Sequence, residues 1–381
     1  MINIIENYKR VRNHTEYLCS FLEIEDFTPQ SAAFASPPKW HIAHTTWFFE
    51  QMILLEYDED YTVFNKDFSY LFNSYYNTIG KRIARHERGL LTRPSVKEVL
   101  NYREYVDEKM LTLLTNKNKE VNTLTTLGLH HEQQHQELFL SDLKYTFSRN
   151  PLNPVYRKEN YVSSLNSEEG WLAVESGIYE IGHQNSDFCF DNELGKHRVF
   201  LEPFKISKAL VTNKEYLEFI EDGGYEKAKY WLDDGWHWLQ ENTITHPLYW
   251  EKLNDEWYQY SLSGLIKLED NDIACHISYY EAAAFAFWKG MRLPTEFEWE
   301  IAAKNLNWGQ RWEWTNSAYL PYPNFKISDG AVGEYNGKFM INTMVLRGAS
   351  TATSKSHSRI TYRNFFAPNT QWQFTGIRLA I

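Results

Sequence analysis

Residues 129–138 read Leu129-His130-His131-Glu132-Gln133-Gln134-His135-Gln136-Glu137-Leu138. They lie in a segment whose apolar residues recur at intervals of three, four or seven, which predicts an amphipathic helix. The recurring positions are Leu124, Leu127, His131, His135, Leu138 and Tyr145. His131 and His135 are one turn apart on this stripe, so both are expected to face the protein core. Two imidazoles on an apolar helix face indicate a site for a divalent cation.

Two metal motifs overlap in these letters. His131, Glu132 and His135 match the H-E-x-x-H motif of zinc peptidases, whereas His131, His135 and Glu137 spell H-x3-H-x-E. At about 100° per residue, His135 lies about 40° from His131 but Glu137 lies about 240° away, which makes Glu137 a poor third ligand. Polar Gln133 and Gln134 stand where a zinc peptidase usually has apolar residues, which favours a substrate-lined cavity. A pair of hydrogen-bonded core histidines is the alternative without a metal.

Length and charge narrow the class of protein. A chain of 381 residues with 43% hydrophobic residues can form two domains with separate cores. Aromatic residues reach 16%, which indicates clefts walled by rings. A net charge of −11 opposes binding to nucleic acid or to an anionic membrane, so small molecules are the expected partners.

Cysteine usage and the N-terminal sequence indicate a reducing compartment. Cys19, Cys189 and Cys275 are widely separated and form no C-x-x-C pair, so we expect neither disulfides nor a thiolate metal site. Met1-Ile2-Asn3 runs straight into a charged amphipathic segment, and we find neither a signal peptide nor an apolar run of membrane-spanning length. We therefore expect a cytoplasmic protein.

Helical periodicity predicts four helices before residue 150. The first covers residues 4–22, the third opens with the capping box Ser95-Val96-Lys97-Glu98, and the fourth runs from about residue 122 to 149. The second begins at Pro37 with Ser36 as N-cap. Residues 58–94, between the second and third helices, show no helical period but many rings and arginines, as expected of a functional loop.

The second predicted helix supplies a third histidine. Trp40, His44 and Trp47 share one stripe, so His44 is expected to point inward between two indoles. His41 lies about 60° round the helix from His44 and ranks below it as a candidate for the inward-facing third histidine. Four amphipathic helices joined by one long crossover describe a bundle, and metal sites in bundles are built from facing helices.

The pattern changes near residues 150–154, where we place a domain boundary. The first domain is then 1–150 and the second 151–381, which makes the chain an α+β protein. The second part has short β-type segments at 177–181 and 197–201 and few regular elements overall. It also has three predicted capping boxes, which begin at Thr212, Ser278 and Thr295.

These residues resemble a known family. Trp40-His41-Ile42-Ala43-His44-Thr45-Thr46-Trp47-Phe48-Phe49-Glu50 together with the later H-x3-H-x-E resembles the DinB-like four-helix bundle of the ergothioneine-biosynthesis sulfoxide synthases. The second half resembles the formylglycine-generating-enzyme (sulfatase-modifying factor) domain, which has a C-type-lectin-like fold. The segments that carry this second resemblance are His276-Ile277-Ser278-Tyr279-Tyr280-Glu281-Ala282, Met291-Arg292-Leu293-Pro294-Thr295-Glu296-Phe297-Glu298-Trp299-Glu300, Val345-Leu346-Arg347-Gly348-Ala349-Ser350 and Gly376-Ile377-Arg378-Leu379-Ala380.

The resemblance implies a mononuclear Fe(II) site held by His44, His131 and His135. Three imidazoles on one face leave open positions for substrates, and iron is required because zinc cannot pass an electron to O2. The family joins the sulfur of cysteine to the imidazole of hercynine, with O2 as oxidant.

The resemblance also implies the residues that bind the two organic substrates. Gln134, Asn364 and the ring of Phe365 match the hercynine pocket, where an aromatic wall attracts a trimethylammonium group. Arg85 falls in the basic loop that grips the carboxylate of the sulfur donor, with Arg82 and Arg88 as lesser candidates.

Two departures from the mycobacterial type point to the branch that takes free cysteine. Phe366 stands where that type has an acid for a γ-glutamyl donor. The catalytic tyrosine of that type has no counterpart in residues 326–344, and Tyr75-Tyr76 resembles the tyrosine pair of the cysteine-using branch instead.

Several alternatives stay open from the sequence. The same scaffold serves enzymes that use γ-glutamylcysteine, histidine in place of hercynine, or a selenium donor. A zinc peptidase with Glu132 as its base and a lectin-like binding module on a helical bundle are the alternatives outside the family.

Overall fold

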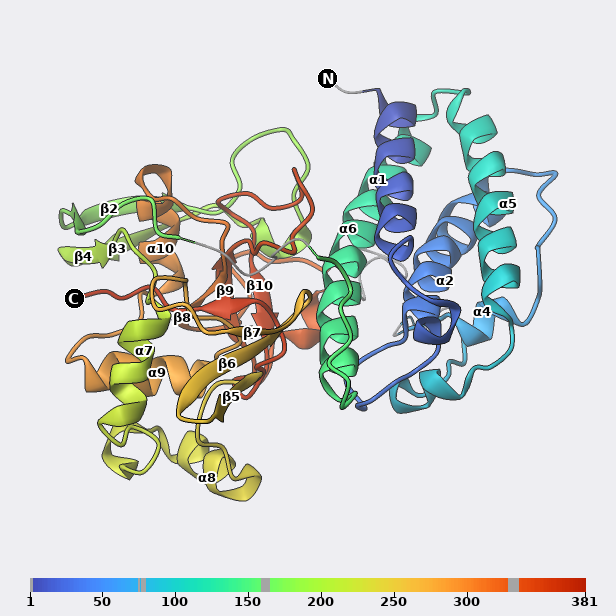
Figure 1. The fold of residues 1–381 in the computed structure, drawn as a ribbon. Helices are drawn as coiled ribbons and strands as arrows, with labels where there is room; N and C mark the ends of the chain where they lie inside the picture. Colours follow the sequence, from blue (N-terminus) through green and yellow to red (C-terminus); the bar gives the residue numbers. More distant parts are fainter. Residues whose placement is uncertain (1–2, 75, 77–79, 159–164, 328–335) are drawn as a thin grey trace. The chain divides into compact units, whose positions relative to one another are not determined.

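The computed structural model describes residues 3–74, 76, 80–158, 165–327 and 336–381. Two compact units make up the chain, one of Met1–Arg157 with Ala352–His357 and the other of Lys158–Thr351 with Ser358–Ile381. The first unit is helical and the second contains the strands, which confirms the expected mixture of helix and sheet (Figure 1). None of the described helices combines the length and apolar character needed to cross a membrane.

Four long helices form the frame of the first unit. They are α1 (Ile4–Cys19), α2 (Pro38–Phe49), α5 (Val96–Leu114) and α6 (Lys119–Ser148). Helix α2 packs against α5 and α6, and α1 packs against the same two helices. The short segments of this unit are η1 (Ile24–Phe27), η2 (Glu50–Leu54), α3 (Leu55–Tyr57), α4 (Phe68–Leu71) and η3 (Arg85–Leu90).

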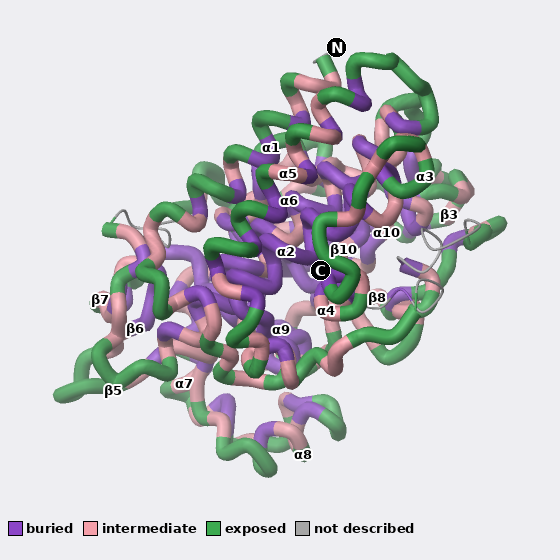
Figure 2. The backbone as a smooth tube through the Cα atoms, turned by 90° about the vertical axis from the view of Figure 1, so that its right-hand side faces the viewer, coloured by how far each residue is buried: buried purple, intermediate pink, exposed green. Residues whose placement is uncertain are grey.

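Helix α2 is the most buried element of the first unit. All 12 of its residues are buried, as the purple trace of α2 in Figure 2 shows. Its start differs from our prediction, because Pro37 is the N-cap and Pro38 the first helical residue. Ser36 lies one position earlier, where its backbone N–H donates to Asp142. The predicted capping box of α5 is confirmed, since Ser95 accepts from Glu98 N–H.

A segment distant in sequence completes the first unit. The Thr353 hydroxyl donates to the Glu137 carboxylate at 2.8 Å, and Gln133 Nε2 donates to the Lys355 carbonyl at 3.1 Å. Ser354 donates to Gln136 on the same helix. These contacts attach residues 352–357 to α6, and they give the carboxylate of Glu137 a structural partner.

Short antiparallel sheets and short helices build the second unit. Strands β2 and β3 coincide with the predicted β segments and pair with each other. The other pairings are β1 with β4, β5-β6-β7, and β10-β9-β8-β11, in which β11 runs parallel to β8. The strands are β1 (Trp171–Val174), β2 (Gly177–Ile181), β3 (His197–Leu201), β4 (Phe204–Ser207), β5 (Trp250–Leu253), β6 (Glu256–Ser261), β7 (Gly264–Lys267), β8 (Trp312–Ala318), β9 (Met344–Gly348), β10 (Asn364–Phe366) and β11 (Thr375–Gly376).

Three helices of the second unit begin at the predicted caps, whereas α8 begins after Leu232, which was not a predicted cap. Thr212, Ser278 and Thr295 each close a capping box with the glutamate three residues later. The α-helices are α7 (Asn213–Glu221), α8 (Asp233–Asn242), α9 (Tyr279–Trp288) and α10 (Glu296–Ala302). The 3-10 segments are η4 (Asp191–Glu193), η5 (Ala228–Tyr230), η6 (Ala303–Asn305) and η8 (Gly337–Phe339).

Candidate metal centre

Three histidines converge in the first unit. His44 comes from α2, and His131 and His135 come from adjacent turns of α6. Their ring centroids are 5.0 Å apart for His44 and His131, 4.7 Å for His44 and His135, and 4.7 Å for His131 and His135. One nitrogen from each ring lies within 4.8 Å of the others, which is close enough for a single metal ion to bind all three. The group forms because α2 and α6 pack together and each presents its histidine stripe inward.

The backbone sets the orientation of His44. Its Nδ1–H donates to the carbonyl oxygen of Phe72 at 2.7 Å, which leaves the lone pair on Nε2. This Nε2 is buried and has no hydrogen-bond partner among the described residues. The ring also stacks with Trp40 at 4.5 Å and with Trp47 at 5.6 Å between centroids. A buried acceptor without a donor is costly, so a ligand that accepts its lone pair would stabilise the site.

The histidines are held in the neutral form that binds metals. Burial lowers the pKa of His131 to about 3. Burial, followed by the neighbouring charge of His131, lowers the pKa of His44 and of His135 well below the ordinary value. Neutral imidazoles are good ligands for iron, copper, nickel and zinc, so the donor set fits a transition metal. The cluster contains no carboxylate among the described residues.

Glu132 points into a different network from the histidines. Its Oε1 accepts from Thr15 Oγ1 at 2.6 Å and from Arg103 Nη2 at 2.7 Å, and its Oε2 accepts from Arg12 Nη1 at 2.8 Å. Burial alone would raise the pKa of Glu132, but the charges of Arg103 and Arg12 outweigh it and hold this pKa at about 2. A zinc peptidase needs this carboxylate as a base beside the metal-bound water. Its three hydrogen bonds to α1 and α5 argue against that alternative.

His41, which the sequence ranked below His44, and Asp142, which the sequence did not single out, also contact the cluster or each other. His41 Nδ1 lies 2.9 Å from His135 Nδ1, and His41 Nε2 lies 3.2 Å from Asp142 Oδ2. Burial lowers the pKa of His41, although Asp142 opposes this effect. The inward position of His41 was available from its rotation on α2, but its contact with Asp142 joins residues 101 positions apart. Helical periodicity cannot predict such a contact.

The predicted arginines differ in their surroundings. Arg85 and Arg82 are exposed, and Arg82 donates to the Ser74 carbonyl at 2.8 Å. Arg88 is only 6% exposed, and its guanidinium lies 3.4 Å from the ring centroid of Trp40. It donates to Ser36 Oγ at 2.9 Å and makes no ion pair with a described acidic residue. Burial and the charge of Arg85 lower the pKa of Arg88, which is the environment of a cation that lacks its anion.

One of the two predicted tyrosines is described. Tyr76 is completely buried, and its ring lies 5.4 Å from that of Trp47, which also stacks with His44. Asn73 fixes the backbone of Tyr76, because it both donates to the Tyr76 carbonyl and accepts from its N–H. Tyr75 lies outside the described residues. Gln134 is partly buried on α6, next to His135.

The remaining predicted residues form β10 of the second unit. Asn364, Phe365 and Phe366 pair with β9, and the Phe365 ring stacks on Tyr319 with centroids 4.2 Å apart. The preceding residue, Arg363, is buried and forms two hydrogen bonds of 2.9 Å with the Glu296 carboxylate. This ion pair fixes the start of β10.

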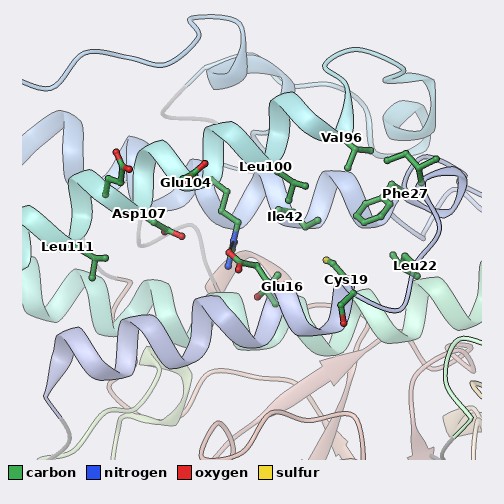
Figure 3. A pocket seen from close by; sticks show the side chains of 15 residues that line it. Glu16, Cys19, Leu22, Phe27, Ile42, Val96, Leu100, Glu104, Asp107 and Leu111 are labelled. Carbon is green, nitrogen blue, oxygen red and sulfur yellow. Dashed lines mark hydrogen bonds and ion pairs between the residues drawn. The ribbon is translucent and has the colours of Figure 1, made fainter.

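A separate groove lies between α1 and α5 (Figure 3). It has a volume of about 810 Å³, with Leu22, Phe27 and Leu100 toward one end and the carboxylates of Glu104 and Asp107 farther along. None of the three histidines lines it. The groove and the histidine cluster are therefore distinct features of the first unit.

Comparison with known proteins finds similarity to one domain family and to several oxygenases. Residues 158–310 match the sulfatase-modifying factor enzyme 1-like domain. The chain is 27% identical over 311 residues to the hercynine oxygenase of Mycolicibacterium smegmatis, covering 67% of this chain and 70% of that protein.

Two further hercynine oxygenases are similar. The enzyme of Mycolicibacterium thermoresistibile is 28% identical, and the match covers 51% of this chain and 54% of that protein. The enzyme of Mycobacterium tuberculosis is 29% identical, and the match covers 50% of this chain and 55% of that protein. The matches thus span little more than half of these two relatives. Together with the domain match, these similarities relate the chain to the hercynine oxygenases.

Proposed function

We propose that this protein is an Fe(II)- and O2-dependent sulfoxide synthase that joins the sulfur of cysteine to the imidazole carbon of hercynine. The overall reaction is balanced: the imidazole C–H and the thiol S–H react with O2 to give a C–S bond, a sulfoxide oxygen and one water molecule. The observation that carries the proposal is the buried cluster of His44, His131 and His135 in a relative of the hercynine oxygenases.

In this proposal the three histidines hold the metal. When bound, iron supplies the redox chemistry that O2 requires, which a zinc ion cannot supply. The side chains prepare the site: Phe72 sets the tautomer of His44, and the stacked Trp40 and Trp47 restrict its ring. Restricting the ligands in advance lowers the entropic cost of metal binding.

The basic loop before α5 is proposed to bind the carboxylate of cysteine. Arg88 is a buried guanidinium without a described acidic partner, and the charge of Arg88 acts on both His41 and His135. A bound carboxylate would neutralise it and would lie near the histidine cluster. Arg85 and Arg82 are exposed neighbours that can complete the carboxylate site.

The other substrate groups follow from the family resemblance. Gln134, Asn364 and Phe365 are proposed to bind hercynine, and Phe366 to favour cysteine over a γ-glutamyl donor. Tyr75 or Tyr76 is proposed as the proton donor. We assign the first unit to the DinB-like four-helix bundles and the second to the C-type-lectin-like fold. We expect the activity in the cytoplasm, with hercynine, cysteine and O2 as substrates and without a nucleic-acid or membrane partner.

A four-way substrate matrix tests the proposal. The protein is loaded with Fe(II) under anaerobic conditions, and hercynine or histidine is then paired with cysteine or γ-glutamylcysteine while O2 uptake and product mass are measured. Hercynine with cysteine should give the highest kcat/KM and a sulfoxide product. A selenium donor forms a further arm. Peptide hydrolysis by the zinc-loaded protein, without any O2-dependent product, would overturn the proposal.

A further inference from the structure

A chain of buried polar contacts leads from Asp142 to His135 in the first unit. Asp142 Oδ2 accepts from the Ser36 backbone N–H at 2.8 Å and lies 3.2 Å from His41 Nε2. The other ring nitrogen of His41, Nδ1, lies 2.9 Å from Nδ1 of His135. The side chains of His41 and Asp142 are only 4% and 0% exposed. Asp142 and His135 both belong to α6, and His41 belongs to α2.

The carboxylate decides where the protons lie along this chain. An ionised carboxylate only accepts hydrogen bonds, so the proton of the neutral His41 ring is on Nε2. His41 Nδ1 is then an acceptor, and the contact of 2.9 Å requires His135 Nδ1 to donate. A neutral His135 that carries its proton on Nδ1 has its lone pair on Nε2.

His44 also carries its proton on Nδ1 and its lone pair on Nε2, but its Nδ1 has a different hydrogen-bond partner. Its Nδ1–H donates to the Phe72 carbonyl, and its Nε2 has no hydrogen-bond partner among the described residues. Two members of the histidine cluster thus have Nδ1 tied to protein and Nε2 left for a ligand. The acceptor of the Nδ1 proton is the backbone carbonyl of Phe72 for His44. For His135 the acceptor is His41, whose other ring nitrogen contacts the Asp142 carboxylate.

We propose that His41 and Asp142 are positioning residues that hold His135 with Nε2 directed at the metal. This inference rests on the proposed metal centre and adds two residues that do not touch the metal themselves. Partners of this kind fix the tautomer and ring orientation of a ligand, and their loss typically weakens metal binding by about 10- to 100-fold.

Three variants separate positioning from simple packing. His41→Phe removes the acceptor for His135 and keeps a ring. His41→Asn keeps a short polar side chain at the same position but gives up the contact with Asp142. Asp142→Asn retains the shape and an oxygen that can accept from Ser36 and His41, but it removes the charge. The last two variants allow the test to proceed if His41→Phe does not fold.

The matched control is Glu50→Gln. Glu50 is also a fully buried carboxylate of the first unit, and it accepts from the hydroxyls of Tyr61 at 2.5 Å and Tyr102 at 2.7 Å. It therefore reports what the loss of a buried charge does to this unit when the histidines keep their partners.

The measurement is the dissociation constant of Fe(II), determined anaerobically by competition with a chelator, together with the absorption spectrum of the Co(II)-substituted protein. His41→Phe should weaken Fe(II) binding about 10- to 100-fold and alter the Co(II) bands. The Fe(II) dissociation constants of Asp142→Asn and His41→Asn should lie between those of His41→Phe and the wild type. Glu50→Gln should stay within about twofold of the wild type.

Unchanged affinity and spectrum in His41→Phe and Asp142→Asn would overturn the inference, as would an equal loss in Glu50→Gln. The variant His135→Ala tests the proposed metal centre itself. If His135→Ala also binds Fe(II) like the wild type, the proposed metal centre itself is wrong, and the inference falls with it.

Discussion

Glu132 and Arg103 form an ion pair of 2.7 Å in which both side chains are 1% exposed. Arg12 binds the same carboxylate at 2.8 Å from the other helix, α1. Glu132 therefore links α1, α5 and α6 behind the histidine cluster. Both oxygens of Glu132 accept hydrogen bonds from α1 and α5, which favours a structural role over a catalytic one for this residue of the H-E-x-x-H motif.

Removal of the Glu132 carboxylate should cost stability and leave the metal site intact. Glu132→Ala removes the buried carboxylate shared by Arg12 and Arg103, which leaves Arg12 with only Asp107 and Arg103 with only the exposed Glu16 as acidic partners among the described residues. We therefore expect the free energy of unfolding to fall by about 3–5 kcal/mol. Urea unfolding measures this loss. The control is Glu16→Ala, which removes the 56% exposed partner of the same Arg103 and should cost about 1 kcal/mol or less. Loss of bound metal from folded Glu132→Gln protein would contradict this account.

The metal content should depend equally on both helices. His44→Ala, His131→Ala and His135→Ala should each remove most of the bound iron, because three neutral imidazoles leave no spare ligand. His130→Ala is the matched control, since His130 neighbours His131 but contacts His357. Inductively coupled plasma analysis of protein purified with Fe(II) gives the iron content. Iron retained by His44→Ala, or lost equally in His130→Ala, would rule out this ligand set.

The basic loop should determine the KM for the sulfur donor. Arg85→Leu is expected to raise the KM for cysteine about tenfold or more, which corresponds to about 1.4 kcal/mol, and to leave the KM for hercynine nearly constant. Lys81→Leu, an exposed cation of the same loop, is the control and should change little. Steady-state kinetics with each substrate varied in turn measures both constants. Equal changes for both substrates would show that Arg85 acts on the fold.

A separate kinetic comparison tests the choice of donor. Cysteine should have a higher kcat/KM than γ-glutamylcysteine, because Phe366 offers no charge to a γ-glutamyl amine. The wild-type enzyme is assayed with both donors at saturating hercynine. A tenfold preference for γ-glutamylcysteine would assign the chain to the other branch.

One tyrosine of the pair should control the product. Tyr75→Phe or Tyr76→Phe is expected to retain iron and substrate binding but to shift the product from sulfoxide towards oxidised cysteine, because the proton donor is lost. Tyr76 is the member that packs on Trp47 within the described structure. Mass spectrometry gives the product ratio for each variant and for the double variant. A constant ratio in all three would mean that the donor lies elsewhere.

Local signals in the sequence predicted most of the elements. The caps at Ser95, Thr212, Ser278 and Thr295 depend on side chains three residues apart, so the sequence pattern contains all of the interacting atoms. The start of α2 was wrong by one residue, because two consecutive prolines both suit a first turn and the structure uses Pro38. The helical period of the sequence also predicted that His44, His131 and His135 lie on inward faces of their helices.

Contacts between distant residues could not be predicted in this way. The partner of Glu137 is Thr353, 216 positions away, and that of His41 is Asp142 on another helix. Neither contact has a periodic signature. The same applies to Glu132, whose letters match a peptidase base until the packing of α1 and α5 supplies Arg12 and Arg103. The role of a side chain that depends on a partner distant in sequence can therefore be assigned only from the packed structure.

The central claim is that O2 supplies the oxygen of a sulfoxide formed with a new C–S bond. The most direct test is to incubate the Fe(II)-loaded protein with hercynine, cysteine and ¹⁸O2 and to determine the product mass. The account predicts a hercynine–cysteine sulfoxide with a single ¹⁸O atom, and no ¹⁸O when the label is supplied as water. A product without the C–S bond, or a sulfoxide labelled from water, would contradict it.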